Sequence, residues 1–346
     1  MSSSSNEFAA APNRATDSVS SESAPGYEVV ICTYNGARYI SRQLESVIHQ
    51  SLPPTRISIY DDCSTDQTVR IAERLLEDSA GQWQGSCIIR RNNKNLGYAF
   101  NFQQGLERAG ETYVLLCDQD DVWMTHKAES LLHKLKQTGA DLVFSDGVPI
   151  DEDDRAIGRK SVLESYGLAG ENVRRFNEKP FDFLVRRNFV NGAAAAINLD
   201  SVRKGLPVPK GIPHDFWLAL WAAAHGGIVC VPTCLYGYRQ HQNNVIGLGA
   251  GGKIGYLRSA WRHPIEPRER ELAIWSMVAT RVDERWSPRS SQLTQQKLDW
   301  MKARFAAGDK RSKLIFWIGA SIVFGRYAKF TIGRSILRDI ASMFRK

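Results

Sequence analysis

Two hydrophobic periodicities alternate along residues 27–145. Short apolar runs predict strands, and longer stretches with apolar residues at every third or fourth position predict helices. The predicted strands are Tyr27–Cys32, Arg56–Tyr60, Cys87–Ile89, Tyr113–Cys117 and Leu142–Ser145. Helical spacing follows the first four, at Ile40–Ile48, Val69–Leu76, Phe102–Ala109 and Leu131–Leu135, and Ser64 with Gln67 predicts a capping box before the second helix. This alternation predicts an α/β fold with a mostly parallel central sheet flanked by helices.

The second half of the chain has a less regular pattern. An apolar helix is predicted after His214-Asp215, with Gly226-Gly227 as its end. The other predicted elements are strands at Ala193–Ile197 and Ile228–Val231, a polar loop at Tyr238–Asn244, and helical structure from about Glu269 to Phe305. These elements are expected to complete the sheet and to add helices at the C-terminal side.

Polar side chains follow three of the predicted strands, at the points where the strands end. Thr33-Tyr34-Asn35-Gly36 follows the first strand, Asp61-Asp62 the second and Asp118–Asp121 the fourth. Ligands of parallel sheets bind beyond the carboxyl ends of the strands, so we expect these groups to meet at one edge. Asn95-Leu96-Gly97 and Asn101 are expected at the same edge. Each segment alone fits ordinary turn chemistry, but together they predict a site for a nucleotide diphosphate.

The segment VLLCDQDDVW places three carboxylates, Asp118, Asp120 and Asp121, directly after an apolar run. Two unit charges about 4 Å apart repel by roughly 4 kcal/mol at an effective dielectric constant near 20. A divalent cation removes this cost, and oxygen ligands suit Mg²⁺ or Mn²⁺, which complete their shells with water and substrate phosphates. The alternative is a solvated acidic turn or a helix N-terminus that favours negative charge.

Composition limits the class of protein. The chain has 346 residues, of which 43% are hydrophobic, so a large core is available. Its 6 cysteines include no Cys-x-x-Cys pair, which argues against a zinc ribbon and indicates a reducing compartment. Residues 1–26 are rich in Ser and Ala, lack the apolar centre of a secretory signal and are predicted to be disordered. We therefore expect a cytoplasmic protein.

The net charge of +8 is concentrated in residues 311–346, so the rest of the chain is nearly neutral. Leu314–Phe324 is apolar but shorter than the roughly 20 residues that span a bilayer. Beyond it, apolar residues share one helical face and Arg334, Arg338 and Arg345 share another. This pattern predicts a peripheral helix on an anionic membrane surface, on the cytoplasmic face; docking on the protein or a dimer contact is the alternative, and the oligomeric state stays open. Nucleic acid is not expected as a partner, because no basic surface with interleaved aromatic residues occurs elsewhere.

The motifs CTYNGARYI, DDCSTDQT, NNKNLGYAFNF, CDQDDVW, HDFW and YRQHQNN occur in this order and resemble those of family 2 glycosyltransferases of the GT-A fold. CDQDDVW with YRQHQNN looks most like the rhamnosyltransferase branch. The resemblance covers about Tyr27 to Ile246. It implies a catalytic domain at residues 27–250 and a helical C-terminal extension at residues 251–346. It also implies metal-dependent, inverting sugar transfer, with dTDP-L-rhamnose as donor and a surface polysaccharide or lipid-linked glycan as acceptor.

The resemblance also assigns roles to individual residues. The residues assigned to the donor nucleotide are Thr33, Tyr34, Asn35, Asp62, Gly97, Asn101 and Asp118. Asp120 is assigned to the metal, Mg²⁺ or Mn²⁺. Asp118 is assigned to the sugar, the ribose or the metal shell, and His241 either completes the metal shell or hydrogen-bonds a phosphate. Asp215 is assigned as the base that deprotonates the acceptor hydroxyl, although an Asp at a helix start also suits an N-cap. Gln119 lies where some relatives have a further Asp.

Several neighbouring residues have less definite roles. Asp121 is expected to cap a helix, and Arg239 is expected either to pair with phosphate oxygens or to lie at the surface. Trp123, Asn191-Gly192 and Trp217 are expected either to form walls of a sugar or acceptor site or to serve ordinary packing and turns.

Two other functions compete with sugar transfer. A sugar nucleotidyltransferase has a similar sheet, but it normally carries a Gly-rich, basic phosphate loop where this chain has Thr33-Tyr34-Asn35-Gly36. A non-catalytic nucleotide-sugar or carbohydrate-binding protein needs no base at Asp215. A processive polysaccharide synthase is disfavoured, because the sequence shows neither spanning helices nor a QxxRW motif.

Overall fold

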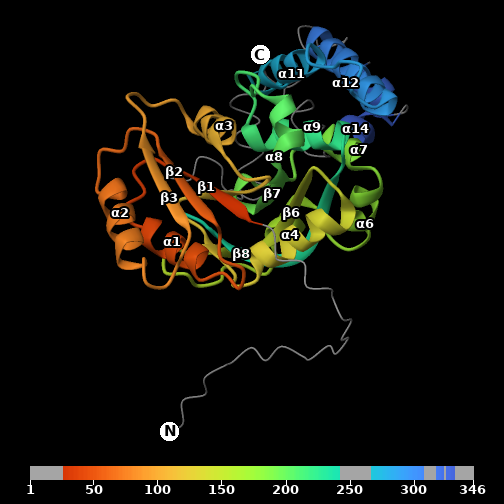
Figure 1. Cartoon of the computed structure of the whole chain (residues 1–346). Helices are drawn as coiled ribbons and strands as arrows, with labels where there is room; N and C mark the ends of the chain where they lie inside the picture. Colours follow the sequence, from red (N-terminus) through yellow and green to blue (C-terminus); the bar gives the residue numbers. More distant parts are fainter. Residues whose placement is uncertain (1–25, 242–265, 308–316, 323–324, 332–346) are drawn as a thin grey trace.

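The computed structural model of the chain describes residues 26–241, 266–307, 317–322 and 325–331 (Figure 1). Within them, the strands form a sheet in the order β3-β2-β1-β4-β7-β6-β8-β5. Their bounds are β1 Tyr27–Thr33, β2 Arg56–Asp61, β3 Ser86–Arg91, β4 Tyr113–Asp118, β5 Val122–Trp123, β6 Leu142–Ile150, β7 Ala195–Asn198 and β8 Ile228–Arg239. Every predicted strand is present, so the α/β prediction is confirmed.

The sheet is parallel on one side and mixed on the other. Strands β3, β2, β1 and β4 are parallel to one another, and β6 is parallel to β8. Strand β7 pairs antiparallel with both β4 and β6, and β5 pairs antiparallel with β8. Strand β8 runs on to Arg239, so the polar loop predicted at Tyr238–Asn244 is wrong for Tyr238 and Arg239; residues 242–244 lie outside the described residues.

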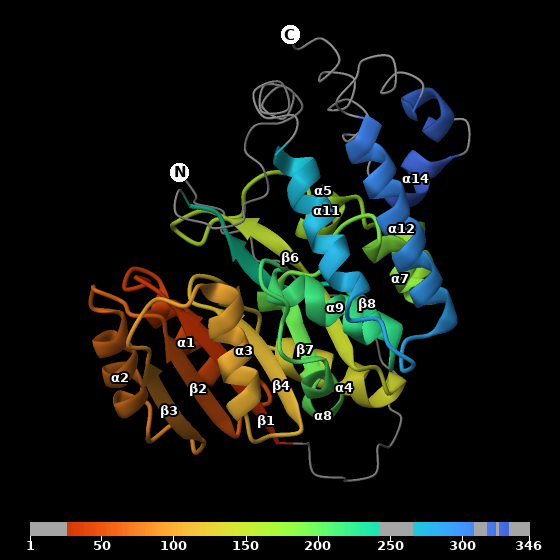
Figure 2. The same ribbon diagram turned by 90° about the horizontal axis from the view of Figure 1, so that it is seen from above.

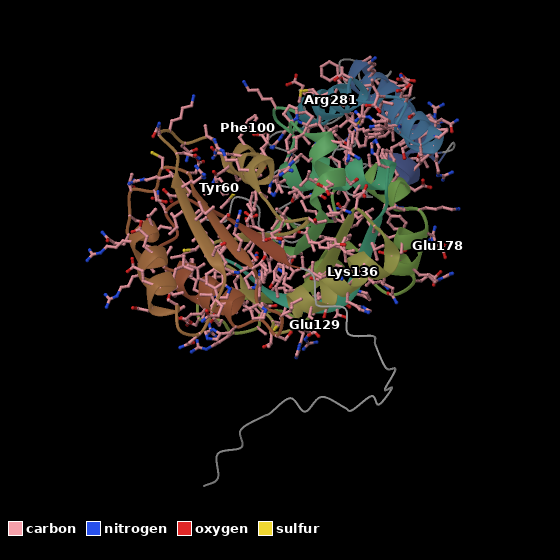
Figure 3. All side chains as sticks on the ribbon, viewed as in Figure 1. Tyr60, Phe100, Glu129, Lys136, Glu178 and Arg281 are labelled. Atoms are coloured by element: carbon pink, nitrogen blue, oxygen red, sulfur yellow. The ribbon has the colours of Figure 1, made fainter. Side chains whose placement is uncertain are left out.

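Helices cover both faces of the sheet (Figures 1 and 2). One face carries α1 (Ile40–Ile48), α2 (Thr68–Asp78) and α4 (Lys127–Thr138). The other carries α3 (Tyr98–Arg108), α8 (Leu199–Val202) and α9 (His214–Ala224). Strand β1 serves both cores, because alternate side chains point to opposite faces: Val29 and Ile31 join one core, Val30 and Cys32 the other. The helices turn polar faces outward, as Glu129 and Lys136 show on α4 (Figure 3).

The remaining helices lie on the side of α9 and β6. They are α5 (Val162–Tyr166), α6 (Glu171–Glu178), α7 (Pro180–Leu184), α11 (Glu266–Ala279), α12 (Pro288–Ala307) and α14 (Arg326–Phe330). Trp275 of α11 packs edge-on against Phe216 of α9, with ring centroids 6.2 Å apart. The helical region predicted from Glu269 to Phe305 consists of the two helices α11 and α12, and the chain between Ala279 and Pro288 separates them.

Several local predictions are wrong or lie outside the described residues. The capping box fails: α2 begins at Thr68, and Ser64 instead donates to Asp61 Oδ1 and accepts the Asn35 N–H. Three predictions fall outside the described part of the chain. They are the domain boundary at residue 250, the disorder of residues 1–25 and the amphipathic helix in segment 332–346. Among the described residues, no helix has the length and apolar character that crossing a bilayer requires.

Candidate active site

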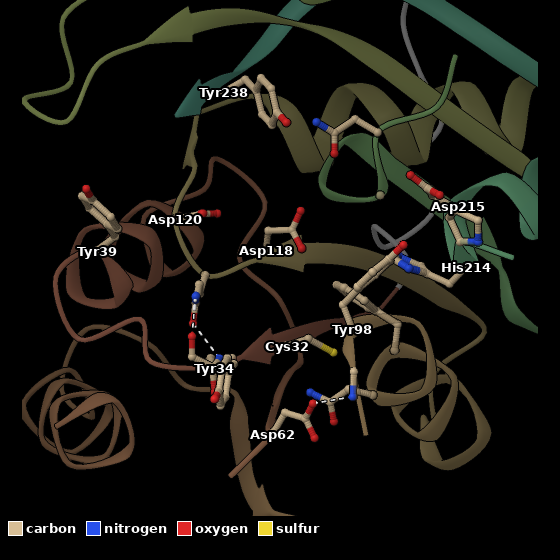
Figure 4. Close-up of a pocket in the computed structure, with 18 of the residues that line it drawn as sticks. Cys32, Tyr34, Tyr39, Asp62, Tyr98, Asp118, Asp120, His214, Asp215 and Tyr238 are labelled. Carbon is tan, nitrogen blue, oxygen red and sulfur yellow. Dashed lines mark hydrogen bonds between the residues drawn. The ribbon is translucent and has the colours of Figure 1, made fainter. Parts of the chain in front are cut away.

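A cavity of about 1080 Å³ opens at the carboxyl ends of β1, β2 and β4 (Figure 4). Register explains why polar groups meet there: Thr33 aligns with Asp61 across β1 and β2, and Cys32 aligns with Asp118 across β1 and β4. All the residues assigned to the donor nucleotide, to the metal or to catalysis line this cavity, namely Thr33, Tyr34, Asn35, Asp62, Gly97, Asn101, Asp118, Asp120, Asp215 and His241. The predicted clustering is therefore present, whereas the role of each residue stays a prediction.

The turn after β1 is held from within the protein. Thr33 donates to Asp61 Oδ1 at 2.9 Å, and Asn35 Oδ1 accepts the Thr65 N–H at 2.8 Å. Asn35 has a positive φ of 49°, which Asn tolerates better than most residues. Tyr34 is 49% exposed on the cavity rim. The side chains of Thr33 and Asn35 thus shape the turn, and Tyr34 is the group that the turn presents.

Asp62 also makes contacts within the protein. Its carboxylate accepts the Leu96 N–H at 2.7 Å, the Gly97 N–H at 2.8 Å and the Asn92 amide at 2.9 Å. Gly97 has a φ of 80°, a conformation that glycine adopts without strain. Because a carboxylate offers about four acceptor positions, one remains for a ligand. Asn101 is buried and donates to the Tyr60 carbonyl at 2.7 Å, so it supports the cavity wall.

The carboxylates of the acidic segment Asp118–Asp121 raise the pKa of one another. Burial, together with repulsion by Asp120 and Asp215, raises the pKa of Asp118 to about 7. Lys127 partly offsets this charge; it is fully buried, 4.0 Å from the Trp123 ring centroid, and burial lowers its pKa to about 7. Burial is the main cause of these shifts, and repulsion between neighbouring carboxylates adds to it for Asp118.

Asp121 does not cap a helix, because α4 begins at Lys127 and Asp121 precedes β5. The side chain is buried, and its Oδ1 accepts the Arg239 N–H at 3.0 Å. Burial and repulsion by Asp120 raise its pKa well above the usual value. Asp121 therefore joins the acidic segment to the end of β8 instead of to a helix terminus.

Arg239 lies neither at the surface nor in the lining of the main cavity. It is 1% exposed, and its guanidinium donates to the carbonyls of Asp120 and Asp151, each at 2.7 Å. It also pairs with the Asp154 carboxylate. Both interpretations from the sequence are therefore wrong: Arg239 fixes the backbone of the acidic segment.

Asp120 and His241 are in direct contact, with Asp120 Oδ2 2.8 Å from His241 Nε2. The His241 ring stacks on Tyr39 at a centroid distance of 5.0 Å. Carboxylate and imidazole are acceptable ligands for Mn²⁺, and Asp118 lines the same cavity. The described residues contain no group of three or more such side chains arranged as a metal cage. Cations of this kind often use one or two carboxylates and complete their shell with substrate phosphates, so the donor set fits.

Asp215 lies in the first turn of α9, whose N-cap is Pro213, so the N-cap alternative is wrong. Burial raises the pKa of Asp215 to about 6, although hydrogen bonds from the Phe216 and Gly192 N–H groups and the Asn188 side chain lower it. The Phe216 N–H donates to Oδ1 at 2.6 Å. A carboxylate with this pKa is ionised near neutral pH and is basic enough to accept a proton.

Trp123 and Trp217 do not form walls of the cavity, because they are 4% and 0% exposed and belong to the two cores. Asn191 and Gly192 do line it. Sequence reasoning missed other lining residues, including Arg38, Tyr39, Tyr98, Glu152, Tyr166, Arg187, Asn188 and Tyr238. Several of these residues come from segments without a clear hydrophobic periodicity. The polar run RRN at residues 186–188 is the local sequence feature there that could have indicated a ligand site.

Comparison with known proteins finds similarity in sequence first. The family model "Glycosyl transferase family 2" matches residues 28–199. A Bacillus subtilis protein named putative teichuronic acid biosynthesis glycosyltransferase TuaG is 32% identical over 37% of this chain, which covers 52% of that relative. The dTDP-rhamnosyl transferase RfbG of Shigella flexneri is 26% identical over 67% of this chain and 80% of its own length. The chain thus spans about half of the Bacillus relative.

Solved structures show the same architecture at low sequence identity. S. aureus TarS in complex with UDP-GlcNAc superimposes with a TM-score of 0.54 at 14% identity, over 92% of this chain and 90% of that one. The mannosyltransferase PcManGT of Pyrobaculum calidifontis, in complex with GDP-Man and Mn²⁺, gives a TM-score of 0.53 at 17% identity, over 92% and 86%. At these identities the similarity concerns the fold, and it confirms the predicted fold class.

Proposed function

Because the chain belongs to glycosyltransferase family 2 and has the GT-A fold, we propose that it transfers a sugar from a nucleotide-sugar donor to an acceptor hydroxyl. The observation that carries this proposal is the shared cavity. It brings the exposed ring of Tyr34, the acidic pair Asp118 and Asp120, and the buried Asp215 to one space. Figure 4 shows Tyr34 and Asp62 on one side, Asp215 on another, and Asp118 between them.

The arrangement supports an inverting reaction. The acceptor hydroxyl gives its proton to the Asp215 carboxylate while its oxygen attacks the anomeric carbon. The bond between that carbon and the diphosphate oxygen breaks, and the electron pair leaves with the nucleoside diphosphate. No covalent intermediate is needed, so a second nucleophilic carboxylate is unnecessary.

The leaving diphosphate requires charge neutralisation. We propose that Asp120, with Asp118 and His241, holds Mg²⁺ or Mn²⁺, which supplies positive charge to the diphosphate when bound. The support is the contact of Asp120 with His241 and the position of Asp118 in the lining of the same cavity. Arg239 keeps the Asp120 backbone in place for this task.

The identity of the sugar and of the acceptor is a finer proposal. We propose dTDP-L-rhamnose as donor and a surface polysaccharide or lipid-linked glycan as acceptor, at the cytoplasmic face of the membrane. Support comes from the motifs CDQDDVW and YRQHQNN and from the names of the Shigella and Bacillus relatives. The basic residues of segment 332–346 suit an acceptor carried on an anionic membrane surface.

A donor screen tests the proposal. The protein is incubated with dTDP-, UDP- and GDP-sugars and Mn²⁺ or Mg²⁺, and release of nucleoside diphosphate is followed with and without simple glycoside acceptors. We expect nucleoside diphosphate release from one donor class, and we expect chelation of the metal to abolish it. Release should be strongly reduced in Asp120→Ala. The rate of transfer to the acceptor should fall at least about 100-fold in Asp215→Asn. The proposal is contradicted if the wild-type protein turns over none of the donors, or if both variants turn over the donor as fast as the wild type does. Donor binding without turnover supports the non-catalytic alternative.

A further inference from the structure

One exposed ion pair belongs to the lining of the cavity. The guanidinium of Arg38, just before α1, lies 2.6 Å from the carboxylate of Glu152, in the segment after β6, and both residues line the cavity. The Arg38 side chain is 60% exposed and the Glu152 side chain 40%. An exposed ion pair contributes little to stability, because water and salt screen it. Another anion can therefore replace Glu152 at this guanidinium with little loss of stability.

The ion pair lies next to the proposed metal ligands. The Arg38 guanidinium carbon is 5.2 Å from the ring centroid of Tyr39. The same ring stacks on His241 at a centroid distance of 5.0 Å, and His241 contacts Asp120 at 2.8 Å. Figure 4 shows Tyr39 and Asp120 on the same side of the cavity. One aromatic ring therefore separates Arg38 from the place proposed for the diphosphate.

The charges that line the cavity favour a contact between Arg38 and the donor. The carboxylates in its described lining are Asp62, Asp118, Asp120, Glu152 and Asp215, and the guanidinium groups are Arg38 and Arg187. A nucleoside diphosphate is an anion, so this lining repels it unless cations face it. Arg187 packs over the Tyr166 ring, whereas Arg38 lies beside the metal ligands. Arginine binds phosphate through parallel N–H donors, so Arg38 suits the diphosphate.

The backbone on both sides of the ion pair is held by other contacts. The N–H of the residue before Arg38 donates to Asp66 Oδ2 at 3.1 Å. In the segment after β6, Asp151 Oδ1 accepts the N–H groups of Asp153 and Arg155, each at 2.9 Å. Separating the two charged groups thus requires movement of two side chains and no rearrangement of either segment.

We propose that Arg38 binds the diphosphate of the donor, and that Glu152 is an internal competitor which the diphosphate displaces from Arg38. This inference rests on the proposed sugar transfer. Before the donor binds, Glu152 neutralises the guanidinium. When the donor binds, phosphate oxygens accept the N–H donors of Arg38 and the Glu152 carboxylate turns to water. The competition lowers the affinity for the nucleoside diphosphate, so it also speeds release of that product.

Two substitutions with opposite expected effects test the proposal. Arg38→Gln removes the cation, and Glu152→Gln removes its competitor. The matched controls are Arg42→Gln and Asp153→Asn, which make the same changes of charge on the same two segments. Arg42 pairs with Asp154 at 3.1 Å, and neither Arg42 nor Asp153 lines the cavity.

Calorimetric titration of the full-length protein with dTDP, UDP and GDP in the presence of Mn²⁺ measures the affinity. We expect Arg38→Gln to weaken binding about tenfold and Glu152→Gln to strengthen it about threefold, with unchanged thermal midpoints. Arg38→Lys, which keeps the charge, should recover part of the loss. The loss in Arg38→Gln should be smaller for the corresponding monophosphates, and the controls should bind as the wild type does. In the double variant of Arg38→Gln and Glu152→Gln the gain should vanish, because Glu152 acts through Arg38.

Three results overturn the inference. They are wild-type affinity of Arg38→Gln, an equal loss of affinity in Arg42→Gln, and an equal loss for mono- and diphosphates. A gain from Glu152→Gln that persists in the double variant overturns the role of Glu152 as a competitor. Failure of the wild-type protein to bind any of the three nucleoside diphosphates instead overturns the proposed function, and this inference with it.

Discussion

The side-chain amide of Gln119 pairs with both backbone polar groups of Tyr34. Its Oε1 accepts the Tyr34 N–H at 2.8 Å, and its Nε2 donates to the Tyr34 carbonyl at 3.0 Å. Gly36 permits this approach, because a Cβ there would lie 2.1 Å from Gln119 Oε1. The residue between Asp118 and Asp120 therefore links the acidic segment to the turn that presents Tyr34, so the position that lacks a carboxylate has a structural task of its own.

We predict that Gln119→Ala weakens nucleoside diphosphate binding about tenfold, because two hydrogen bonds of about 1 kcal/mol each no longer hold the turn. Calorimetric titration of dTDP or UDP with Mn²⁺ measures the effect. Gln137→Ala, at an exposed position on α4, is the control and should bind as the wild type does. If the Gln119 variant binds the nucleoside diphosphate as tightly as the wild type does, the turn keeps its shape without the two hydrogen bonds between Gln119 and Tyr34.

The pKa of Asp215 predicts a pH dependence of the rate. Burial raises it to about 6, and the proposed base acts only when ionised. We therefore expect kcat/KM to fall about tenfold per pH unit below pH 6 and to level off above it. Asp118, Tyr98 and Tyr166, on other elements, interact electrostatically with this carboxylate. A steady-state profile between pH 4.5 and 8, at saturating Mn²⁺, is the measurement, and a flat acidic limb would exclude Asp215 as the base.

The same carboxylate is expected to reduce the stability of the protein. Its folded-state pKa of about 6 exceeds the ordinary value of 3.8, so folding is disfavoured whenever the group is charged. The penalty is absent below pH 4, grows as the pH rises to about 6 and is constant above that, at a magnitude on the order of 2–3 kcal/mol. Asp215→Asn should therefore unfold at the same temperature as the wild type near pH 4 and at a higher temperature at pH 7. A lower midpoint at pH 7 would indicate that the carboxylate stabilises the fold.

Much of the fold and the clustering of the site could be predicted from local sequence. The strands that end at Thr33, Asp61 and Asp118 have apolar patterns of their own, and parallel neighbours bring their carboxyl ends together. The pairing of β7 between β4 and β6 could not be predicted in this way, because short apolar runs such as Ala195–Asn198 carry no information on strand direction or neighbours.

The surroundings of Arg239 show why the contacts within the site could not be predicted from the sequence. An arginine in a polar run is typical of a surface loop, and only partners far along the chain reverse that expectation. Asp120 lies 119 positions away, and Asp151 lies 88 positions away. Burial of this cation is thus a property of the tertiary structure, as is the contact between His241 and Asp120.

We predict that Arg239→Lys reduces the free energy of unfolding by roughly 2–4 kcal/mol. Lysine retains the charge but cannot donate in several fixed directions at once, so buried carbonyl groups lose their partners. The variant should also need more Mn²⁺ for the same nucleotide affinity, because the Asp120 backbone is no longer held. Chemical denaturation and calorimetry measure the two effects. Arg155→Lys, whose partner Asp153 is exposed, is the control; a wild-type response from the Arg239 variant would assign Arg239 no role beyond its charge.

Segment 332–346 is predicted to bring the protein to anionic membranes through Arg334, Arg338 and Arg345. Truncation after Thr331 is a suitable test, because it keeps the hydrogen bond from Lys297 to the Phe330 carbonyl at 2.6 Å and the tilted packing of the Phe330 ring on Trp300. We expect full-length protein to sediment with liposomes that contain anionic lipid, at low salt, and the truncated protein to stay in the supernatant. Replacing the three arginines by glutamine should give an intermediate result if apolar residues also contribute. Equal sedimentation of truncated and intact protein, with equal thermal midpoints, would mean that another surface carries any affinity for the membrane.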